Sequence, residues 1–278
     1  MSAADDGKRR VGRSFHRHAE GYDRFALVQK RVVARLEHLV AAHLQQAPQR
    51  VLDIGCGTGA MLAALAGRYP RTALWGLDLA FNMARQSALR FGEQALFVNG
   101  DAERLPFRNK SFDLVVSAST FQWVDRIDVV FEECLRVLQG DGLLCVAFFG
   151  GRTLWELQEC YREAVTNRFG AADSRQGRMQ RFRDRDEVRH VLSRLGCDQV
   201  VIAQESEMEY HPDVAELLRS IKAIGAATAG RSDAVGGLGW RGLLADMANI
   251  YRERFLDRGI IPATYEVIYV VARKRAAD

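Results

Sequence analysis

The segment VLDIGCGTG, residues 51–59, carries the residue types of a ligand-binding turn. Asp53 lies two residues before Gly55, and glycines recur at 57 and 59. A short apolar run leads into the turn and a helix-forming run follows it, which predicts a strand, a tight turn and a helix start. Such a turn brings a ligand against exposed backbone N–H groups at a helix N-terminus.

Two cofactor classes match this turn. Gly55, Gly57 and Ala60 loosely satisfy the G-x-G-x-x-G/A pattern of dinucleotide sites. The carboxylate of Asp53 would repel the pyrophosphate of NAD, but it would attract the ammonium group on the methionine tail of S-adenosylmethionine (SAM). We therefore interpret Asp53-x-Gly55-x-Gly57-x-Gly59 as a SAM-binding motif, with NAD binding and a purely structural turn as the alternatives.

Further polar residues follow the ends of the next apolar runs. Asp78, with Leu79 beside it, is placed to hold ribose hydroxyls, which both cofactors carry. Asp101 suits the adenine amino group and the Ala102 backbone N–H suits a ring nitrogen, although an acid here is also typical of a surface turn. Ser117 ends a fourth run. Because the carboxyl ends of parallel strands meet at one edge of a sheet, we expect these residues to form one cofactor site.

An alternation of strands and helices must position these residues. It predicts an α/β fold of the class I SAM-methyltransferase, Rossmann-like type: a seven-stranded, mostly parallel sheet with helices on both faces. The stretch of about fifty residues before the last strand is too long for a plain connection, and its two helical patterns predict a helical lid over the site. Strands are expected at 50–54, 73–78, 95–99, 112–118, 142–149, 199–210 and 264–274, with helices near 60–68, 81–91, 127–138, 153–168, 213–224 and 239–257.

The chain divides by composition into a polar beginning, a core and an inserted segment. Ser14 is a plausible N-cap for the first helix, and Tyr22 marks the junction between two helices. The expected parts are a disordered leader over 1–13, helices over the active site at 14–48, the SAM-binding core at 49–210, the lid at 211–261, and the final strand and tail at 262–278.

Composition excludes several classes of protein. The 278 residues carry a net charge of only +4, which does not indicate nucleic-acid binding. No apolar run approaches membrane length, and the first ten residues lack the apolar core of a signal peptide. The five cysteines are scattered without metal-ligand spacing. We therefore expect a cytoplasmic protein with reduced thiols and no metal, membrane or nucleic-acid partner, and we expect a monomer.

Aromatic and basic residues follow the fourth and fifth strands. Phe121, Gln122 and Trp123 lie just past the fourth strand, where a methyl acceptor would bind, and we expect them to line its pocket rather than serve only the core. Arg152 follows the fifth strand near the same edge, with a solvated arginine as the alternative. The arginine-rich stretch over 175–185 is typical of a solvated face, but it also suits an acidic partner.

Several segments together resemble one family. The sequence is similar to the malonyl-[acyl-carrier protein] O-methyltransferases of biotin synthesis, over nearly its whole length. The glycine motif is common to many SAM enzymes, whereas the segment at 220–226 lies in the expected lid and is more specific. The segments that carry the resemblance are AEGYD at 19–23, VQK at 28–30, LDIGCGTG at 52–59, TFQW at 120–123, FFG at 148–150, LRSIKAIGA at 218–226 and ATYE at 263–266.

The resemblance implies methylation of the free carboxylate of malonyl-acyl carrier protein, which starts the pimeloyl chain. A carboxylate is already ionised at neutral pH, so it needs alignment and a dry pocket rather than a general base. Tyr22 and Arg152 are then the expected catalytic partners of the carboxylate, with Gln122 and Trp123 shaping the pocket wall. Because a carrier protein is acidic, the expected docking residues are Arg175, Arg178, Arg181, Arg219 and Lys222.

Other functions stay open on the sequence alone. Another small carboxylic acid or a quinone are rival acceptors, and a SAM-binding module without activity is a rival class. A quinone would require a base to remove a phenolic proton, and no histidine occupies an identifiable position at the strand ends.

Overall fold

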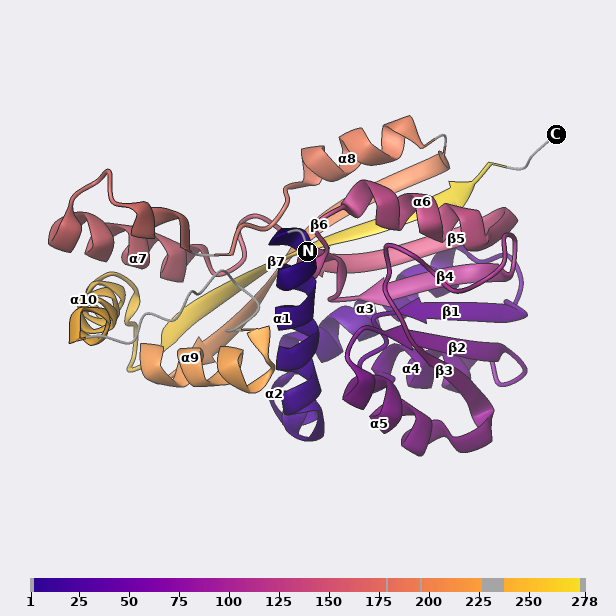
Figure 1. Ribbon diagram of the computed structural model, residues 1–278, viewed down its shortest axis with the longest axis horizontal. Coiled ribbons are helices and arrows are strands. Elements are labelled where there is room, and N and C mark those ends of the chain that lie inside the picture. Colours follow the sequence, from indigo (N-terminus) through magenta and orange to yellow (C-terminus); the bar gives the residue numbers. More distant parts are fainter. Residues whose placement is uncertain (1–2, 179, 196, 227–237, 276–278) are drawn as a thin grey trace.

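The computed structural model describes residues 3–178, 180–195, 197–226 and 238–275. Within them, seven strands form one sheet in the order β3-β2-β1-β4-β5-β7-β6 (Figure 1). The pairing is parallel from β3 through β5, and β7 runs antiparallel to both of its neighbours. The strands are β1 (Arg50–Ile54), β2 (Ala73–Asp78), β3 (Ala95–Asn99), β4 (Phe112–Ala118), β5 (Leu138–Phe149), β6 (Cys197–His211) and β7 (Ile261–Lys274).

Helices cover both faces of this sheet, which confirms the predicted fold class. Apolar side chains of α3, α4, α7, α9 and α10 join one buried cluster, and those of α6 and α8 join another on the opposite face. α5 packs along β2 and β3. The helices are α3 (Leu27–His43), α4 (Ala60–Arg68), α5 (Phe81–Phe91), α6 (Ile127–Val137), α7 (Trp155–Phe169), α8 (Arg185–Arg194), α9 (Val214–Ala223) and α10 (Leu238–Phe255).

The strand order places a ligand crevice at the end of β1. The chain passes from β1 to β2 and β3 on one side, and then returns to add β4 on the other side. The connections that follow β1 and β4 therefore diverge at their carboxyl ends, the position where open α/β sheets bind ligands. Four predicted strands, β1 to β4, match their expected bounds, whereas β5 begins at Leu138, four residues earlier than expected.

The beginning of the chain differs from its prediction. Residues 3–18 form helix α1 (Ala3–His18), so the expected disordered leader over 1–13 is wrong for residues 3–13. Ser14 is not an N-cap but lies inside α1, where its hydroxyl donates to the Gly225 carbonyl at 2.7 Å. The segment has few apolar residues of its own, so its order depends on tertiary contacts. α1 lies across the carboxyl ends of the central strands (Figure 1).

The segment between β6 and β7 contains the two expected helices. α9 contributes residues to a cavity beside α1, described below, whereas α10 packs mainly on α7. That this segment acts as a lid therefore stays a prediction, and it is supported by α9, which contributes to the cavity wall, rather than by α10. No helix in the described ranges is both long and apolar enough to cross a bilayer.

Candidate functional site

The glycine turn after β1 has the backbone conformation that only glycine adopts easily. Gly55, Gly57 and Gly59 all have positive φ, at +69°, +54° and +82°. A Cβ on Gly55 would collide with the Thr120 side chain, whereas a Cβ on Gly57 would meet nothing within 4 Å. Gly57 therefore leaves open space beside its Cα, while its N–H donates to Asp78 and its carbonyl accepts from Ser87. Gly59 packs against Phe91 and lines neither cavity beside the turn.

Three neighbouring cavities converge beside this turn. Tyr22, the first residue of α2 (Tyr22–Phe25), lines all three. Each cavity is named after a residue that lines that cavity and neither of the other two. The Asp78 cavity is lined by Lys8, Val11, Phe15, Tyr22, Gly55, Gly57, Asp78, Leu79, Met83, Asp101, Ala102, Ser119 and Trp123, among others. The Asp53 cavity is lined by Tyr22, Gln29, Lys30, Asp53, Gly55, Gly57 and Thr58, among others. The Phe149 cavity is lined by Phe15, Tyr22, Gln29, Ser119, Gln122, Trp123, Phe149, Thr153, Leu154, Phe182, Ile221, Ile224, Ala226 and Tyr265.

Asp53 is a buried carboxylate without a partner. Its side chain lies on the wall of the Asp53 cavity with 1% exposure, and neither oxygen has a hydrogen-bond partner within the described part of the chain. Burial, together with the charge of Asp78, raises the pKa of Asp53 to about 8. An isolated buried carboxylate is costly, so this site is complete only with a cationic ligand group. An ammonium group fits it and a phosphate does not.

The Asp78 carboxylate is held by backbone donors. Its oxygens accept hydrogen bonds from the N–H groups of Gly57 at 2.9 Å and Ala80 at 2.7 Å. Burial raises the pKa of Asp78 to about 6, and the two N–H groups oppose that rise. Because each carboxylate oxygen has more than one lone pair, the group can still accept from ligand hydroxyls. Leu79, the next residue, lines the same cavity.

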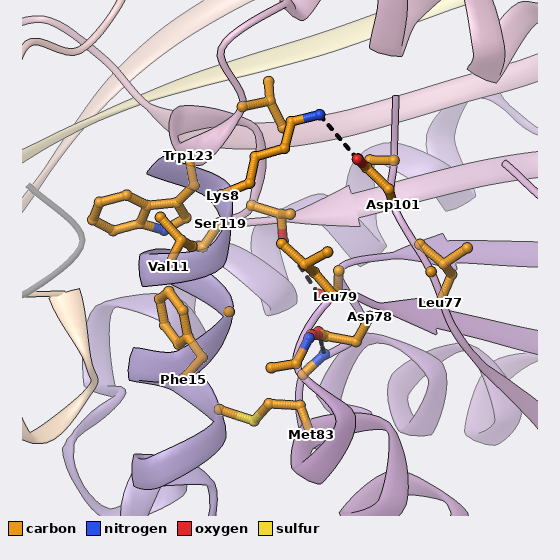
Figure 2. Close-up of a pocket in the computed structure, with 18 of the residues that line it drawn as sticks. Lys8, Val11, Phe15, Leu77, Asp78, Leu79, Met83, Asp101, Ser119 and Trp123 are labelled. Atoms are coloured by element: carbon orange, nitrogen blue, oxygen red, sulfur yellow. Dashed lines mark hydrogen bonds and ion pairs between the residues drawn. The ribbon is translucent and has the colours of Figure 1, made fainter. Parts of the chain in front are cut away.

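Asp101 lines the Asp78 cavity (Figure 2), and Ala102 lines it too. Asp101 accepts from Lys8 Nζ at 2.9 Å and from the Glu103 backbone N–H at 2.9 Å. Lys8 also pairs with Glu103 at 2.6 Å. Lys8 thus ties α1 across the mouth of the cavity, a contact that the sequence reading missed.

α1 supplies the other residues that sequence reasoning missed. Val11 and Phe15 line the Asp78 cavity, and Phe15 packs edge-on against Trp123, with ring centroids 5.9 Å apart. Val11 and Phe15 are four residues apart, and this spacing could have predicted that both lie on one apolar face of a helix. Lys30 on α3 was also missed, and it places a cation at the wall of the Asp53 cavity.

Two predicted site residues belong to the core instead. The hydroxyl of Ser117 is buried and donates to the Ile54 carbonyl at 2.7 Å, so it joins β4 to β1 and does not line the cavities. Phe121 is fully buried and packs between Phe131 and Phe148, so its predicted place in the acceptor pocket is wrong. Ser119, two residues past Ser117, occupies the rim instead.

Tyr22, Gln122 and Trp123 do meet at the Phe149 cavity. Burial and the charges of Asp78 and Asp23 raise the pKa of the Tyr22 phenol well above its ordinary value, so it stays a neutral hydrogen-bond donor. The amide of Gln122 donates to the Ser119 carbonyl at 2.7 Å and accepts from the Phe149 N–H at 3.4 Å. These three residues shape a pocket that is otherwise mainly apolar.

The structure does not bring the predicted arginine to this pocket. Arg152 is exposed, with its guanidinium 5.9 Å from the centroid of the Trp155 ring, and it does not line the Phe149 cavity. Among the described residues, no lysine or arginine lines this cavity. Arg152 therefore does not join Tyr22 at this cavity, because its side chain turns outward toward Trp155, the first residue of α7.

The proposed docking cations have mixed surroundings. Arg175 pairs with Asp173 at 2.7 Å, and Arg181 pairs with Glu187 at 2.6 Å. Two others stand on α9, whose Ile221 lines the Phe149 cavity: Arg219, which pairs with Glu216 at 2.8 Å, and the exposed Lys222. The side chain of Arg178 lies outside the described residues.

Comparisons with known proteins agree with this geometry. A family model described as "Methyltransferase domain" matches residues 52–146. The malonyl-[acyl-carrier protein] O-methyltransferase of Geobacter sulfurreducens is 45% identical over 270 residues, covering 96% of this chain and 99% of the relative. The protein of the same name from Methylovorus sp. is 40% identical and covers 97% of this chain and 90% of the relative.

Solved structures show the same fold at low identity. An N-methyltransferase of Haemonchus contortus, solved with S-adenosylhomocysteine, has a TM-score of 0.54 at 18% identity, covering 87% of this chain and 53% of that chain. The partnerless Asp53 carboxylate, the open Gly57 backbone and the acids at the strand ends suit that class of cofactor. Because two relatives of that name are 45% and 40% identical over nearly the whole chain, the chain belongs to the malonyl-[acyl-carrier protein] O-methyltransferase family.

Proposed function

We propose that this protein transfers a methyl group from SAM to the free carboxylate of malonyl-acyl carrier protein, the first step of pimeloyl chain synthesis for biotin. The observation that carries the proposal is the convergence of three cavities at Tyr22, one of which holds the partnerless carboxylate of Asp53. Membership of the family supplies the acceptor. We further propose that the enzyme is monomeric and cytoplasmic.

Each region of the cofactor site has a chemical counterpart. When bound, SAM supplies a methyl group activated by a positively charged sulfur. Asp53 is placed to accept from the ammonium group of the methionine tail, and Lys30 at the same cavity to pair with its carboxylate. Asp78 is placed to accept from the ribose hydroxyls. Asp101 and Ala102 stand where the adenine edge would be read.

The Phe149 cavity provides the conditions that the acceptor needs. The malonyl carboxylate is ionised at neutral pH, so the protein removes no proton. Its work is to hold the attacking oxygen, the methyl carbon and the sulfur in line, which contributes about 7–11 kcal/mol in well-oriented reactions. Negative and positive charges cancel as the methyl moves, so mainly apolar walls favour the transition state over the charged reactants.

The acidic carrier protein is proposed to dock beside α9. Arg219 and Lys222 stand on this helix, which also forms part of the cavity wall. A phosphopantetheine arm can then enter past Ile221 while the carrier stays on the surface. The arginines over 175–185 remain second candidates, because Phe182 in that stretch also lines the cavity.

One assay tests the proposal. The purified protein is incubated with radiolabelled SAM and either malonyl-acyl carrier protein, malonyl-CoA, free malonate or a hydroxylated quinone. We expect base-labile methyl ester on the carrier protein, at a higher kcat/KM than with the other acceptors. Label on the quinone or on a free acid alone would assign the enzyme to a rival substrate. Binding of S-adenosylhomocysteine (SAH) without transfer to any acceptor would indicate a binding module.

A further inference from the structure

Ser119 is a rim residue to which neither the sequence motifs nor the family resemblance gives a role. It follows directly after β4 and lines both the Asp78 cavity and the Phe149 cavity (Figure 2). Its hydroxyl oxygen is buried and has no hydrogen-bond partner within the described part of the chain. A buried hydroxyl without a partner at a cavity wall is costly, so a ligand group is the natural partner.

The backbone of Ser119 is held in an unfavourable conformation. Its φ is +59°, a region that residues other than glycine seldom adopt. The N–H donates to the Ala147 carbonyl at 2.7 Å, and its own carbonyl accepts from the Gln122 side chain at 2.7 Å. Gln122 is in turn tied to the Phe149 N–H. The surrounding structure therefore fixes this residue against its own preference, a pattern concentrated at functional sites.

We propose that the Ser119 hydroxyl donates a hydrogen bond to the acceptor carboxylate and orients it for methyl transfer. The inference rests on the proposed function, since it assumes a carboxylate acceptor. The methionine carboxylate of the cofactor is the other anion nearby, but it is expected in the Asp53 cavity with Lys30, and Ser119 does not line that cavity.

A hydroxyl suits this reaction better than a guanidinium does. One carboxylate oxygen forms a bond to the methyl carbon while the carbon–sulfur bond breaks and its electron pair stays on sulfur. A neutral ester and a neutral thioether result, and no proton moves, so Ser119 keeps its hydrogen. A cation would stabilise the charged reactant more than the transition state, whereas a neutral donor on the other oxygen orients the group at less cost.

The geometry of the cavity agrees with this choice. Ser119 and Tyr22 both line the Phe149 cavity as neutral hydroxyl donors, and the part of the chain that the structure describes contributes no lysine or arginine to its lining. Ser119 thus takes the orienting role that the sequence reading gave to Arg152.

The test compares Ser119→Ala and Ser119→Gly with a matched control. Both variants remove the hydroxyl, and glycine also favours the positive φ, so Ser119→Gly folds even if the alanine variant does not. The control is Ser111→Ala, just before the opposite end of β4, where the hydroxyl donates to the Arg108 carbonyl. For each we measure kcat and KM with malonyl-acyl carrier protein, SAH affinity by calorimetry, and Tm.

We expect kcat/KM to fall about 10- to 100-fold in both Ser119 variants, the range for a lost hydrogen bond to a charged group. SAH affinity should change less than twofold, and Ser111→Ala should behave as wild type. Activity equal to wild type in Ser119→Gly would overturn the inference and leave the proposed function standing. SAH binding weakened in parallel would overturn it by making Ser119 a cofactor contact. A wild-type protein inactive on malonyl-acyl carrier protein would overturn the proposed function and this inference together.

Discussion

The two ends of the active site are built on different principles. The proposed cofactor end, formed by the Asp53 and Asp78 cavities, takes most of its aspartates and glycines from the carboxyl ends of parallel strands and the turns that follow them, and α1 and α3 add Lys8 and Lys30. The proposed acceptor end, the Phe149 cavity, draws side chains from α1, α9, the stretch around Phe182 and β7. Its described lining residues provide neutral donors and apolar walls, and none of them is a lysine or arginine.

This difference reflects what each end must do. The cofactor is cationic and rich in hydrogen-bonding groups, so specific carboxylates and bare backbone recognise it. The acceptor loses its charge during the reaction, so its end of the site positions the group without neutralising it beforehand. Changes at one end should therefore leave the other largely intact.

The largest expected effect follows removal of the buried charge at the cofactor end. Asp53→Asn should weaken SAH binding at least about 100-fold, because the ammonium group loses its charged partner. The same change removes a costly buried carboxylate, so the Tm of the ligand-free protein at pH 8 should not fall. Calorimetry and thermal unfolding measure both effects. Asp128→Asn, on the exposed first turn of α6, is the control. Unchanged SAH affinity would contradict the assignment of Asp53.

The converse change places a charge at the acceptor end. Ile221→Asp puts a carboxylate on the wall of the Phe149 cavity, where it repels the malonyl group. We expect kcat/KM for malonyl-acyl carrier protein to fall about 30- to 100-fold, as for like charges about 6 Å apart near a protein surface. SAH affinity should stay within twofold of the wild-type value, and Ile221→Val should change neither SAH affinity nor kcat/KM appreciably. If SAH binding fell equally, the two ends would not be separable.

A pH dependence should be confined to the cofactor end. Because the folded pKa of Asp53 is raised to about 8, its neutral form is favoured in the ligand-free protein. Its contribution to stability is present below about pH 4 and is lost as the pH rises to about 8. SAH affinity should do the opposite, rising about tenfold per pH unit between pH 6 and 8 as Asp53 ionises. Titration calorimetry over this range measures it, and the slope should vanish in Asp53→Asn. Because the pKa of Asp78 is raised to about 6, SAH affinity should depend more steeply on pH only below that value.

Charge reversal on α9 should affect only the encounter with the carrier protein. Arg219→Glu combined with Lys222→Glu should raise KM for malonyl-acyl carrier protein about five- to tenfold at low salt, and less at 0.5 M salt. Activity on a short malonyl thioester should be unchanged. Arg194→Glu, at the end of α8, is the control. An equal loss with the short thioester would refute docking at this helix.

The smallest effect is expected where α1 closes over the cofactor end. Lys8→Met removes the ion pairs with Asp101 and Glu103, which are partly exposed and therefore weak. We expect SAH to dissociate about two- to threefold faster in stopped-flow measurements, with kcat/KM for the acceptor unchanged. Slower dissociation would show that Lys8 competes with the adenine for Asp101 rather than holding the helix closed.

Sequence reasoning succeeded where a pattern is local. Four strands had their bounds predicted, and Asp53, Asp78 and Asp101 were placed at the rim, because a buried parallel strand reads as a short apolar run and its functional residues follow directly. Asp184 and Glu187 form a capping box at the start of α8, and this local pattern could have predicted the helix, which the sequence analysis did not include.

Sequence reasoning failed where packing decides. Ser117 is the second-last residue of β4, and Ser119 directly follows the strand. If the strand alternation simply continued, both side chains would point to the same face of the sheet. Instead, the Ser117 hydroxyl donates to the Ile54 carbonyl of β1, and Ser119 lines the cavities. The positive φ of Ser119 causes that difference, and no residue type announces it. The sequence likewise could not decide where Phe121 lies, because an aromatic residue just past a strand suits the core and a cavity wall equally well.

By itself, the sequence determined the parallel sheet, the glycine turn and the charge pattern that selects a cationic cofactor. These depend on residues within a few positions of each other, whose backbone and charge preferences act locally. Only the tertiary structure decided that α1 is ordered, that Arg152 turns away from the Phe149 cavity and that Ser119 lines it. Those outcomes depend on contacts between segments far apart in the chain, and each is settled by burial and fit that no single segment encodes.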